Sequence, residues 1–181
     1  MEENKEIIKE NKKGSSLFDF ASIVMTGIVA IAVVFTFFFR TATVSGRSMQ
    51  PTLNGGDMLM VTAFDNTHER GDIVVITQPN AFNEPIIKRI IAVGGDKVDI
   101  NFTTGVVTVN GQEEEYTDSL TLQQFDIAFP ITVPEGCVFV LGDNRAESLD
   151  SRSTEIGCID ERFIVGKVLF RLFPLGEGKV E

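Results

Sequence analysis

The sequence has few of the residues on which several kinds of enzyme site depend. Its 181 residues include no tryptophan, one histidine and two cysteines. A histidine-rich metal site is therefore excluded, and a Ser-His-Asp triad could be built only through His68. Cys137 and Cys158 stand far apart without a Cys-x-x-Cys pair, so they cannot form a cysteine-based zinc site unaided.

Positive charge is also scarce. The chain carries 16 Lys and Arg against 26 Asp and Glu, a formal net charge of -10 at pH 7. A surface that binds nucleic acid needs clustered lysines and arginines, and the sequence has no such run. We therefore expect no nucleic-acid partner.

A long apolar run lies near the start of the chain. The segment 20–39 reads FASIVMTGIVAIAVVFTFFF and holds no charged residue. At about 1.5 Å per residue, a helix of this length spans about 30 Å, the thickness of a bilayer's hydrocarbon core. The run predicts a transmembrane anchor, with a tail at 1–19 before it and a body at 40–181 after it.

The charges around this run suggest an orientation. Lys9, Lys12 and Lys13 precede it, while Arg40 and Arg47 follow it closely. Lysines and arginines near a span favour the cytoplasmic side, so we expect a cytoplasmic tail and an extracytoplasmic body at the cell membrane. A cleaved signal peptide is the alternative, although its apolar region usually covers only about 7–15 residues.

After Arg40 the sequence changes to short apolar runs between turn signals. Such a pattern is typical of a mainly β, mostly antiparallel fold. Asn110-Gly111 after an alternating run predicts a hairpin. The polar stretch 112–136 departs from the pattern, and we expect an inserted lobe over 97–136. The expected strands are 57–61, 73–77, 86–93, 98–102, 106–109, 138–141 and 163–170.

Ser48 is the first candidate for chemistry. In the segment SGRSMQPTL, Gly46 precedes it and Pro51 follows it, so its hydroxyl sits on a constrained turn. An ordinary turn with solvent-facing serines is the alternative. Ser48 lies eight residues past Arg40, which limits its distance from the bilayer to about 27 Å even for an extended chain.

Lys88 is the second candidate. Strand alternation over 86–93 places Ile86, Lys88, Ile90 and Ala92 on one face. Apolar neighbours desolvate an ammonium group and lower its pKa, which is the condition for a lysine to act as a general base. The alternative is a lysine at a sheet edge that extends its amine into water. Arg89, beside it, is expected to pair with an acid.

The third candidate is the segment GDNRAESLDSR at 142–152. It reads as a strand end followed by a turn whose Asp and Asn side chains bond their own backbone. Asp150 and Arg152 are expected to share a strand face and stiffen the loop, and Ser148 could donate its hydroxyl to orient a neighbouring amine. A solvated loop is the alternative.

Taken together, these segments resemble the type I signal peptidases of peptidase family S26. The resemblance rests on SGRSMQPTL, GDIVVI at 71–76, IKRIIAVGGD at 87–96 and GDNRAESLDSR, in this order. Members are membrane-anchored serine proteases with a Ser/Lys dyad. They fold as a β-rich catalytic core with an inserted, more variable lobe. The short length and single anchor are similar to the smaller Gram-positive-type members.

The resemblance implies a role for each matching residue. Ser48 matches the nucleophile, Lys88 the general base, and Ser148 the hydroxyl that helps to orient the lysine. A lysine at 88 points to the bacterial type. One position departs from the pattern: some members use a serine just upstream as a second oxyanion donor, and Gly46 stands there, with Ser45 one residue away. The residues matched to support of the site are Asp143, Arg145, Asp150 and Arg152.

We therefore expect a serine endopeptidase that removes signal peptides from exported preproteins, after small Ala-x-Ala-like residues, without metal or organic cofactor. A membrane-tethered β-domain that serves as a non-catalytic scaffold or regulator is one alternative, and Ser/Lys chemistry directed at the chain itself is another. His68 is expected on a solvated loop. The two cysteines are expected to pack as small apolar side chains, although a bridge outside the cytoplasm stays open.

Overall fold

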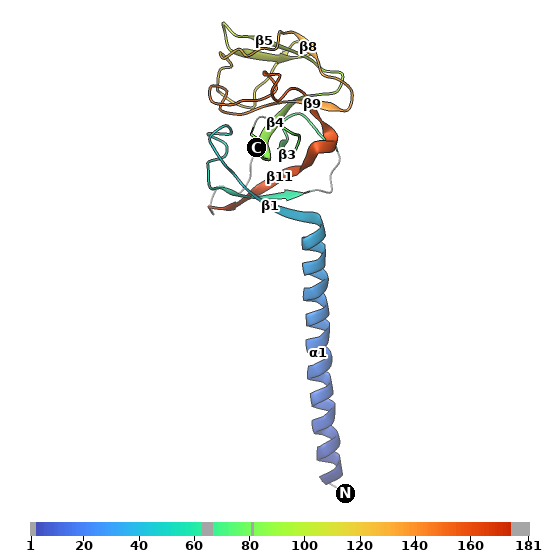
Figure 1. Cartoon of the computed structure of the whole chain (residues 1–181). Helices are drawn as coiled ribbons and strands as arrows, with labels where there is room; N and C mark the ends of the chain where they lie inside the picture. The colour runs from blue at the N-terminus through green and yellow to red at the C-terminus, as the bar shows by residue number, and fades with distance from the viewer. Residues whose placement is uncertain (1–2, 63–66, 81, 175–181) are drawn as a thin grey trace. The chain divides into compact units, whose positions relative to one another are not determined.

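The computed structural model describes residues 3–62, 67–80 and 82–174 (Figure 1). The chain divides into two compact units, a helical unit up to Phe39 and a β unit from Arg40. The candidate residues of the sequence all lie in the β unit.

The helical unit is built on α1, Glu3–Phe38. Its apolar part, Phe18–Phe38, is 21 residues long and has no buried side chains, so by length and composition it can cross a membrane. Two hydroxyls in this part are satisfied along the helix, since Thr26 and Thr36 donate to carbonyls four residues earlier. The helix begins well before the apolar run expected at 20–39, and Phe39 already belongs to the first strand.

The β unit consists of eleven strands among the described residues, and the sequence pattern located seven of them to within three residues. The four strands that it missed are β1, β7, β8 and β10. Three of these are two residues long, too short to show an alternation. The strands are β1 Phe39–Thr43, β2 Met58–Thr62, β3 Ile73–Ile76, β4 Ile86–Val93, β5 Lys97–Asn101, β6 Val106–Val109, β7 Gln112–Glu113, β8 Ile131–Thr132, β9 Cys137–Leu141, β10 Ile159–Asp160 and β11 Ile164–Phe173, with a 3₁₀ turn η1 at Glu161–Phe163.

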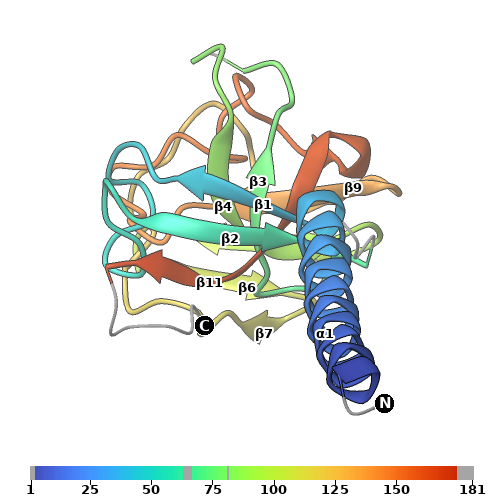
Figure 2. The same ribbon diagram turned by 90° about the horizontal axis from the view of Figure 1, so that it is seen from below.

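These strands form two antiparallel sheets. The larger has the order β1-β2-β11-β3-β4-β9-β10 and the smaller β7-β6-β5-β8. Figure 2 shows β1, β2 and β11 side by side, and Figure 1 shows β5 and β8 beyond β4 and β9. The smaller sheet spans 97–132, between β4 and β9 in the chain.

A continuous apolar cluster joins the smaller sheet to the larger one. Val98 and Ile100 of β5 point inward because buried and exposed residues alternate along this strand. They pack with Ile91 of β4 and with Phe139 and Leu141 of β9. The smaller sheet is therefore fixed against the two strands that lead to Lys88 and to the 142–152 segment.

The alternation expected along β4 is interrupted. The register against β9 shifts between Ile90 and Ala92, which is a β-bulge. Ile90 packs with Val74 and Val140, whereas Ala92 packs with Ile91 in the cluster under the smaller sheet. The expectation that Ala92 shares the face of Lys88 is therefore wrong, because the extra residue rotates the end of the strand.

Candidate active site

Ser48 and Lys88 line the same cavity, which has a volume of about 520 Å³. Its walls come from the end of β1 and the loop after it, from the segment leading into β4, and from the turn after β9. These segments are far apart in the sequence, and the pairing of β4 with β9 in the larger sheet brings two of them side by side. The lining residues are Thr43, Val44, Ser45, Gly46, Arg47, Ser48, Met49, Phe82, Glu84, Pro85, Ile86, Ile87, Lys88, Glu147 and Leu149.

Ser48 lies half-buried in the loop between β1 and β2, and Asn144 holds its backbone. The N–H of Asn144 donates to the carbonyl of Ser48 at 3.0 Å, and the side-chain amide donates to the carbonyl of Arg47 at 3.2 Å. Within the described part of the chain, no hydrogen bond uses the backbone N–H of Ser48. Gly46 has a φ of 84°, a conformation that favours glycine.

The contact between Gly142 and Ser48 leaves no room for a side chain at position 142. A Cβ there would lie 2.4 Å from the carbonyl oxygen of Ser48 and 2.3 Å from the hydroxyl of Ser148. The turn after β9 therefore supports Ser48 through main-chain atoms, and glycine is the residue that permits this close approach.

Lys88 is buried, with 3% of its surface exposed. Burial is the main reason that the pKa of its amine falls from 10.5 to about 8. The charge of Arg152 lowers this pKa further, whereas the charges of Asp150 and Asp143 raise it. Among the described residues, no hydrogen bond or ion pair is made by the Lys88 amine. At a pKa of about 8, roughly a fifth of the side chain is neutral at pH 7.4.

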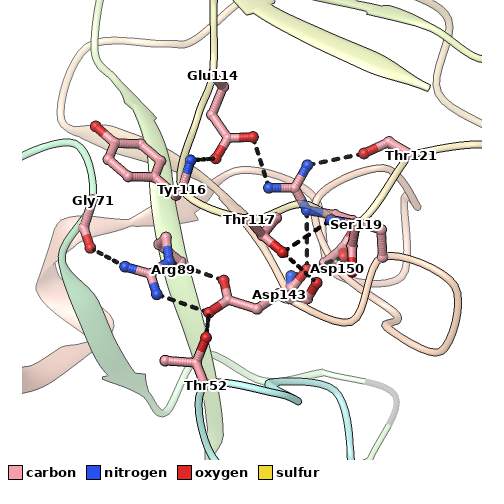
Figure 3. Close-up of polar contacts among 12 residues, drawn as sticks. Thr52, Gly71, Arg89, Glu114, Tyr116, Thr117, Ser119, Thr121, Asp143 and Asp150 are labelled. Carbon is pink, nitrogen blue, oxygen red and sulfur yellow. Dashed lines mark hydrogen bonds and ion pairs between the residues drawn. The ribbon is translucent and has the colours of Figure 1, made fainter. Parts of the chain in front are cut away.

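Arg89, next to Lys88, forms a buried ion pair with Asp143 (Figure 3). The guanidinium donates to both carboxylate oxygens, at 2.9 and 2.7 Å, and also to the carbonyl of Gly71. The hydroxyl of Thr52 donates to the same carboxylate at 2.5 Å. One carboxylate thus joins the strand of Lys88 to the loop of Ser48, and the expectation that Arg89 pairs with an acid is confirmed.

Arg145 and Arg152 are the other two buried arginines near the turn. Arg145 pairs with Glu114 at 2.7 Å and donates to the carbonyl of Gly142 at 3.1 Å. Arg152 pairs with Asp150 at 2.8 Å and also donates to the carbonyls of Arg145 and Ser148. Asp150 in turn accepts a hydrogen bond from the backbone N–H of Gly142.

The pairing of Asp150 with Arg152 was expected from the sequence, but its setting was not. These residues lie in a succession of bends and turns, so the expected strand face does not exist. The two side chains meet because the chain folds back on itself here, with Ser153 N–H donating to the Asp150 carbonyl.

Ser148 is buried, and its hydroxyl oxygen has no hydrogen-bond partner. It lies against Gly142, on the same turn that contacts Ser48. The structure therefore places Ser148 beside Gly142, the residue next to the Ser48 carbonyl. The Ser148 hydroxyl makes no hydrogen bond to Lys88.

Three remaining expectations concern residues away from the cavity. His68 lies on a loop whose described neighbours are exposed, as expected, but its own side chain is half-buried, and its Nδ1 is buried without a hydrogen-bond partner. Cys137 and Cys158 are free and half-buried, and both pack against the cluster under the smaller sheet, as expected of small apolar side chains. Burial raises the pKa of both thiols, that of Cys158 to about 11.

Comparison with known proteins identifies the family of the chain. The family described as signal peptidase, peptidase S26, matches residues 17–173. The chain belongs to the signal peptidase family. It is accordingly a serine endopeptidase that removes signal peptides from preproteins, and its apolar helix fits the membrane anchor of this family. Membership favours the enzyme over the non-catalytic scaffold.

Individual signal peptidases align with much of the chain. A signal peptidase I from Bacillus licheniformis is 32% identical over 179 residues, covering 93% of this chain and 95% of that protein. A signal peptidase IB from Staphylococcus aureus is 35% identical over 177 residues, covering 84% and 91%. A solved signal peptidase I from Enterococcus faecalis V583 is 27% identical with a TM-score of 0.45, covering 56% of this chain and 96% of that one.

Several residues of this signal peptidase site were not found from the sequence. Thr52 and Asn144 lie within quoted segments, but their types alone do not show what they bind. Glu114 stands between two other glutamates, a run that is normally a solvated surface. The signal that could have led to Glu114 is Arg145, because an arginine that becomes buried requires an acidic partner.

Proposed function

We propose that Ser48 is the nucleophile and Lys88 the general base of this signal peptidase. Neutral Lys88 takes the proton of the Ser48 hydroxyl as its oxygen attacks the carbonyl carbon of the scissile peptide bond. The resulting ammonium of Lys88 then gives that proton to the leaving amine, which becomes the new amino terminus of the mature protein. Lys88 is neutral again beside the acyl-enzyme.

The second half of the reaction uses the same pair of groups. Lys88 takes a proton from water, the hydroxide attacks the ester formed with Ser48, and the serine oxygen leaves with the proton from Lys88. The free backbone N–H of Ser48 is a suitable donor to the negatively charged oxygen of each tetrahedral intermediate. Ser45 and Gly46, which line the cavity, are the segment from which a second donor would come.

The observation that carries this proposal is the state of Lys88. A buried amine without a charged partner, with a pKa near 8, lines the same cavity as a serine hydroxyl. Desolvation is the physical means by which a lysine becomes a base near neutral pH. Ser148, Asp143, Arg145, Asp150 and Arg152 are proposed to support this pair, since they surround the turn that contacts Ser48.

The substrates are proposed to be exported preproteins held at a lipid bilayer, cut after small Ala-x-Ala-like residues. Met49 and Ile86 line the cavity and are candidates for the shallow apolar walls that exclude larger side chains. The lysines before the apolar part of α1 support a single-pass topology with the amino end in the cytoplasm and the β unit outside. Metal and organic cofactors have no role in the proposed steps.

The experiment that tests the dyad compares three purified variants on a preprotein substrate. Ser48→Ala and Lys88→Ala are expected to lower kcat by at least about 10³-fold, because each removes a group that takes part in every turnover. Lys97→Ala, which removes an exposed lysine of β5, is the matched control and should cleave normally. Normal processing by both dyad variants would reject the assignment. Fragments that form from the purified chain alone would indicate self-cleavage.

A further inference from the structure

The segment 114–127 follows β7 and has no helix or strand, yet it makes an extensive set of contacts with the turn region 142–154. The Thr117 hydroxyl donates to the carbonyl of Asp143 at 3.3 Å, and the Ile127 N–H donates to the carbonyl of Arg152 at 3.3 Å. Asp126 accepts hydrogen bonds from the backbone and side chain of Thr154. A segment from the inserted part therefore covers the turn that supports the active site.

Each of the three buried arginines near this turn, Arg89, Arg145 and Arg152, also contacts this segment. The guanidinium of Arg89 lies 5.7 Å from the centre of the Tyr116 ring, and that of Arg152 lies 5.1 Å from the centre of the Phe125 ring. Arg152 also donates to the carbonyl of Gln123. Arg145 binds two side chains of this segment. It donates to the Thr121 hydroxyl at 2.9 Å and to the Glu114 carboxylate at 2.7 Å.

The contact with Glu114 differs from the others because it supplies a charge. The side chains of Arg145 and Glu114 are 2% and 3% exposed, so the pair is shielded from water. A buried cation without its partner is strongly unfavourable. Asp143 and Asp150 are already paired with Arg89 and Arg152, so Glu114 is the carboxylate that neutralises Arg145.

Arg145 also contacts Gly142, the residue beside the Ser48 carbonyl. The Nε of Arg145 donates to the carbonyl of Gly142. At Gly142 there is no space even for a methyl group, because a Cβ there would collide with both the Ser48 carbonyl oxygen and the Ser148 hydroxyl. A shift of Arg145 would therefore be transmitted to Gly142 and from there to Ser48.

We propose that Glu114 is a positioning residue of the active site, acting through Arg145 on the Gly142 turn that supports Ser48. The inserted part of the chain thereby contributes to catalysis without touching substrate. This inference rests on the proposed role of Ser48. It assigns a function to the middle residue of a run of three glutamates, whose outer members, Glu113 and Glu115, are exposed.

The run of three glutamates provides matched controls. Glu114→Gln, Glu113→Gln and Glu115→Gln make the same chemical change at neighbouring positions, and the full-length chain in detergent is assayed with a soluble signal-peptide substrate. We expect Glu114→Gln to lower kcat about 10- to 100-fold while KM changes less than about 3-fold, because misplacing a reacting group by about 1 Å costs up to about 10² in rate. The two control variants should stay within about 2-fold of the parent in both constants.

Thermal unfolding and near-UV circular dichroism of each variant separate positioning from loss of fold. If Glu114→Gln is not folded at the assay temperature, Thr121→Val, which removes the other side-chain acceptor of Arg145, decides instead. We expect Thr121→Val to lower kcat and to leave KM nearly unchanged. This fall in kcat should be smaller than the 10- to 100-fold fall expected for Glu114→Gln.

A folded Glu114→Gln with parental kcat would overturn the positioning role, as would a loss that only follows the unfolded fraction. Should Glu114→Gln not fold, a folded Thr121→Val with parental kcat would do the same. These outcomes are distinct from failure of the dyad, because Ser48→Ala is assayed beside them. If Ser48→Ala remains active, the proposed nucleophile is wrong, whatever Glu114→Gln does.

Discussion

At the scale of the single residue, Lys88, the proposed base, is the side chain whose environment matters most to the proposed mechanism. Its own strand places it opposite Val74 of β3, and its side chain is buried. Two carboxylates, Asp150 and Asp143, favour its charged form, but desolvation outweighs them and lowers the pKa to about 8. The net effect depends on Asp150 and Asp143 being themselves paired with arginines.

The first prediction concerns the pH dependence of cleavage. Because the base must be neutral and its pKa is lowered to about 8, kcat/KM should rise with pH and level off above that value. The measurement is kcat/KM between pH 6 and pH 10 with a soluble peptide that does not titrate in this range. A profile that is flat through pH 8, or that falls as pH rises from 6 to 8, would contradict the assignment of Lys88 as base.

At the scale of the element, the loop between β1 and β2 is held from two directions. Thr52 donates its hydroxyl to Asp143, which is bound to Arg89 of β4. Arg171 of β11 donates to the Thr52 carbonyl and pairs with Asp57 at the end of the loop. The serine loop is thus attached both to the strand of Lys88 and to the strand beside β2.

The second prediction tests the attachment to β4. Thr52→Val keeps the shape of the side chain but removes the hydroxyl donor, so the loop and Asp143 lose their direct link. We expect kcat to fall about 10-fold, with a loss of stability of about 2 kcal/mol, the usual contribution of one hydrogen bond to a charged group. Thr52→Ser, which keeps the hydroxyl, should restore most of the rate. Equal rates for the valine and serine variants would show that the link has no role in catalysis.

The elements differ in how far the sequence could predict them. β4 was expected with its observed bounds because eight residues show an apolar, β-branched pattern between turn signals. The bulge at its end was not expected, because it depends on the register with β9, about 50 residues later. Burial of Lys88 could be inferred from its neighbours, but the choice of Asp143 as the partner of Arg89 is a property of the fold. The two-residue strands and the pairing of Glu114 have no local signal.

At the scale of the whole molecule, the apolar helix and the β unit have separate tasks. The proposed nucleophile lies in the β unit, and so do the residues that line the cavity. Ser48 follows Arg40, the first residue of the β unit, by only eight positions. The helix is therefore expected to affect where the enzyme meets its substrate rather than the chemical steps.

The third prediction separates these tasks. A chain that begins at Phe39 keeps all of β1 and should cleave a soluble peptide with kcat/KM within about 3-fold of the full-length enzyme. Cleavage of a preprotein embedded in vesicles should fall at least about 10-fold, because enzyme and substrate no longer share a membrane surface and the effective concentration drops. Both rates are measured with the same preparations. An equal loss on both substrates would mean that the helix contributes to the site itself.

The buried amine of Lys88 has a consequence for heat resistance. Its pKa is about 8 in the folded chain and near 10.5 when exposed, so below pH 8 the folded enzyme carries an unfavourable buried charge, a cost of about 3 kcal/mol that disappears only as pH approaches 10.5. Replacing this lysine by methionine would therefore strengthen the fold near neutrality while abolishing turnover. A laboratory selection for thermal stability alone would therefore favour variants that have lost Lys88, the proposed base. Efforts to stabilise this enzyme must measure cleavage in every round.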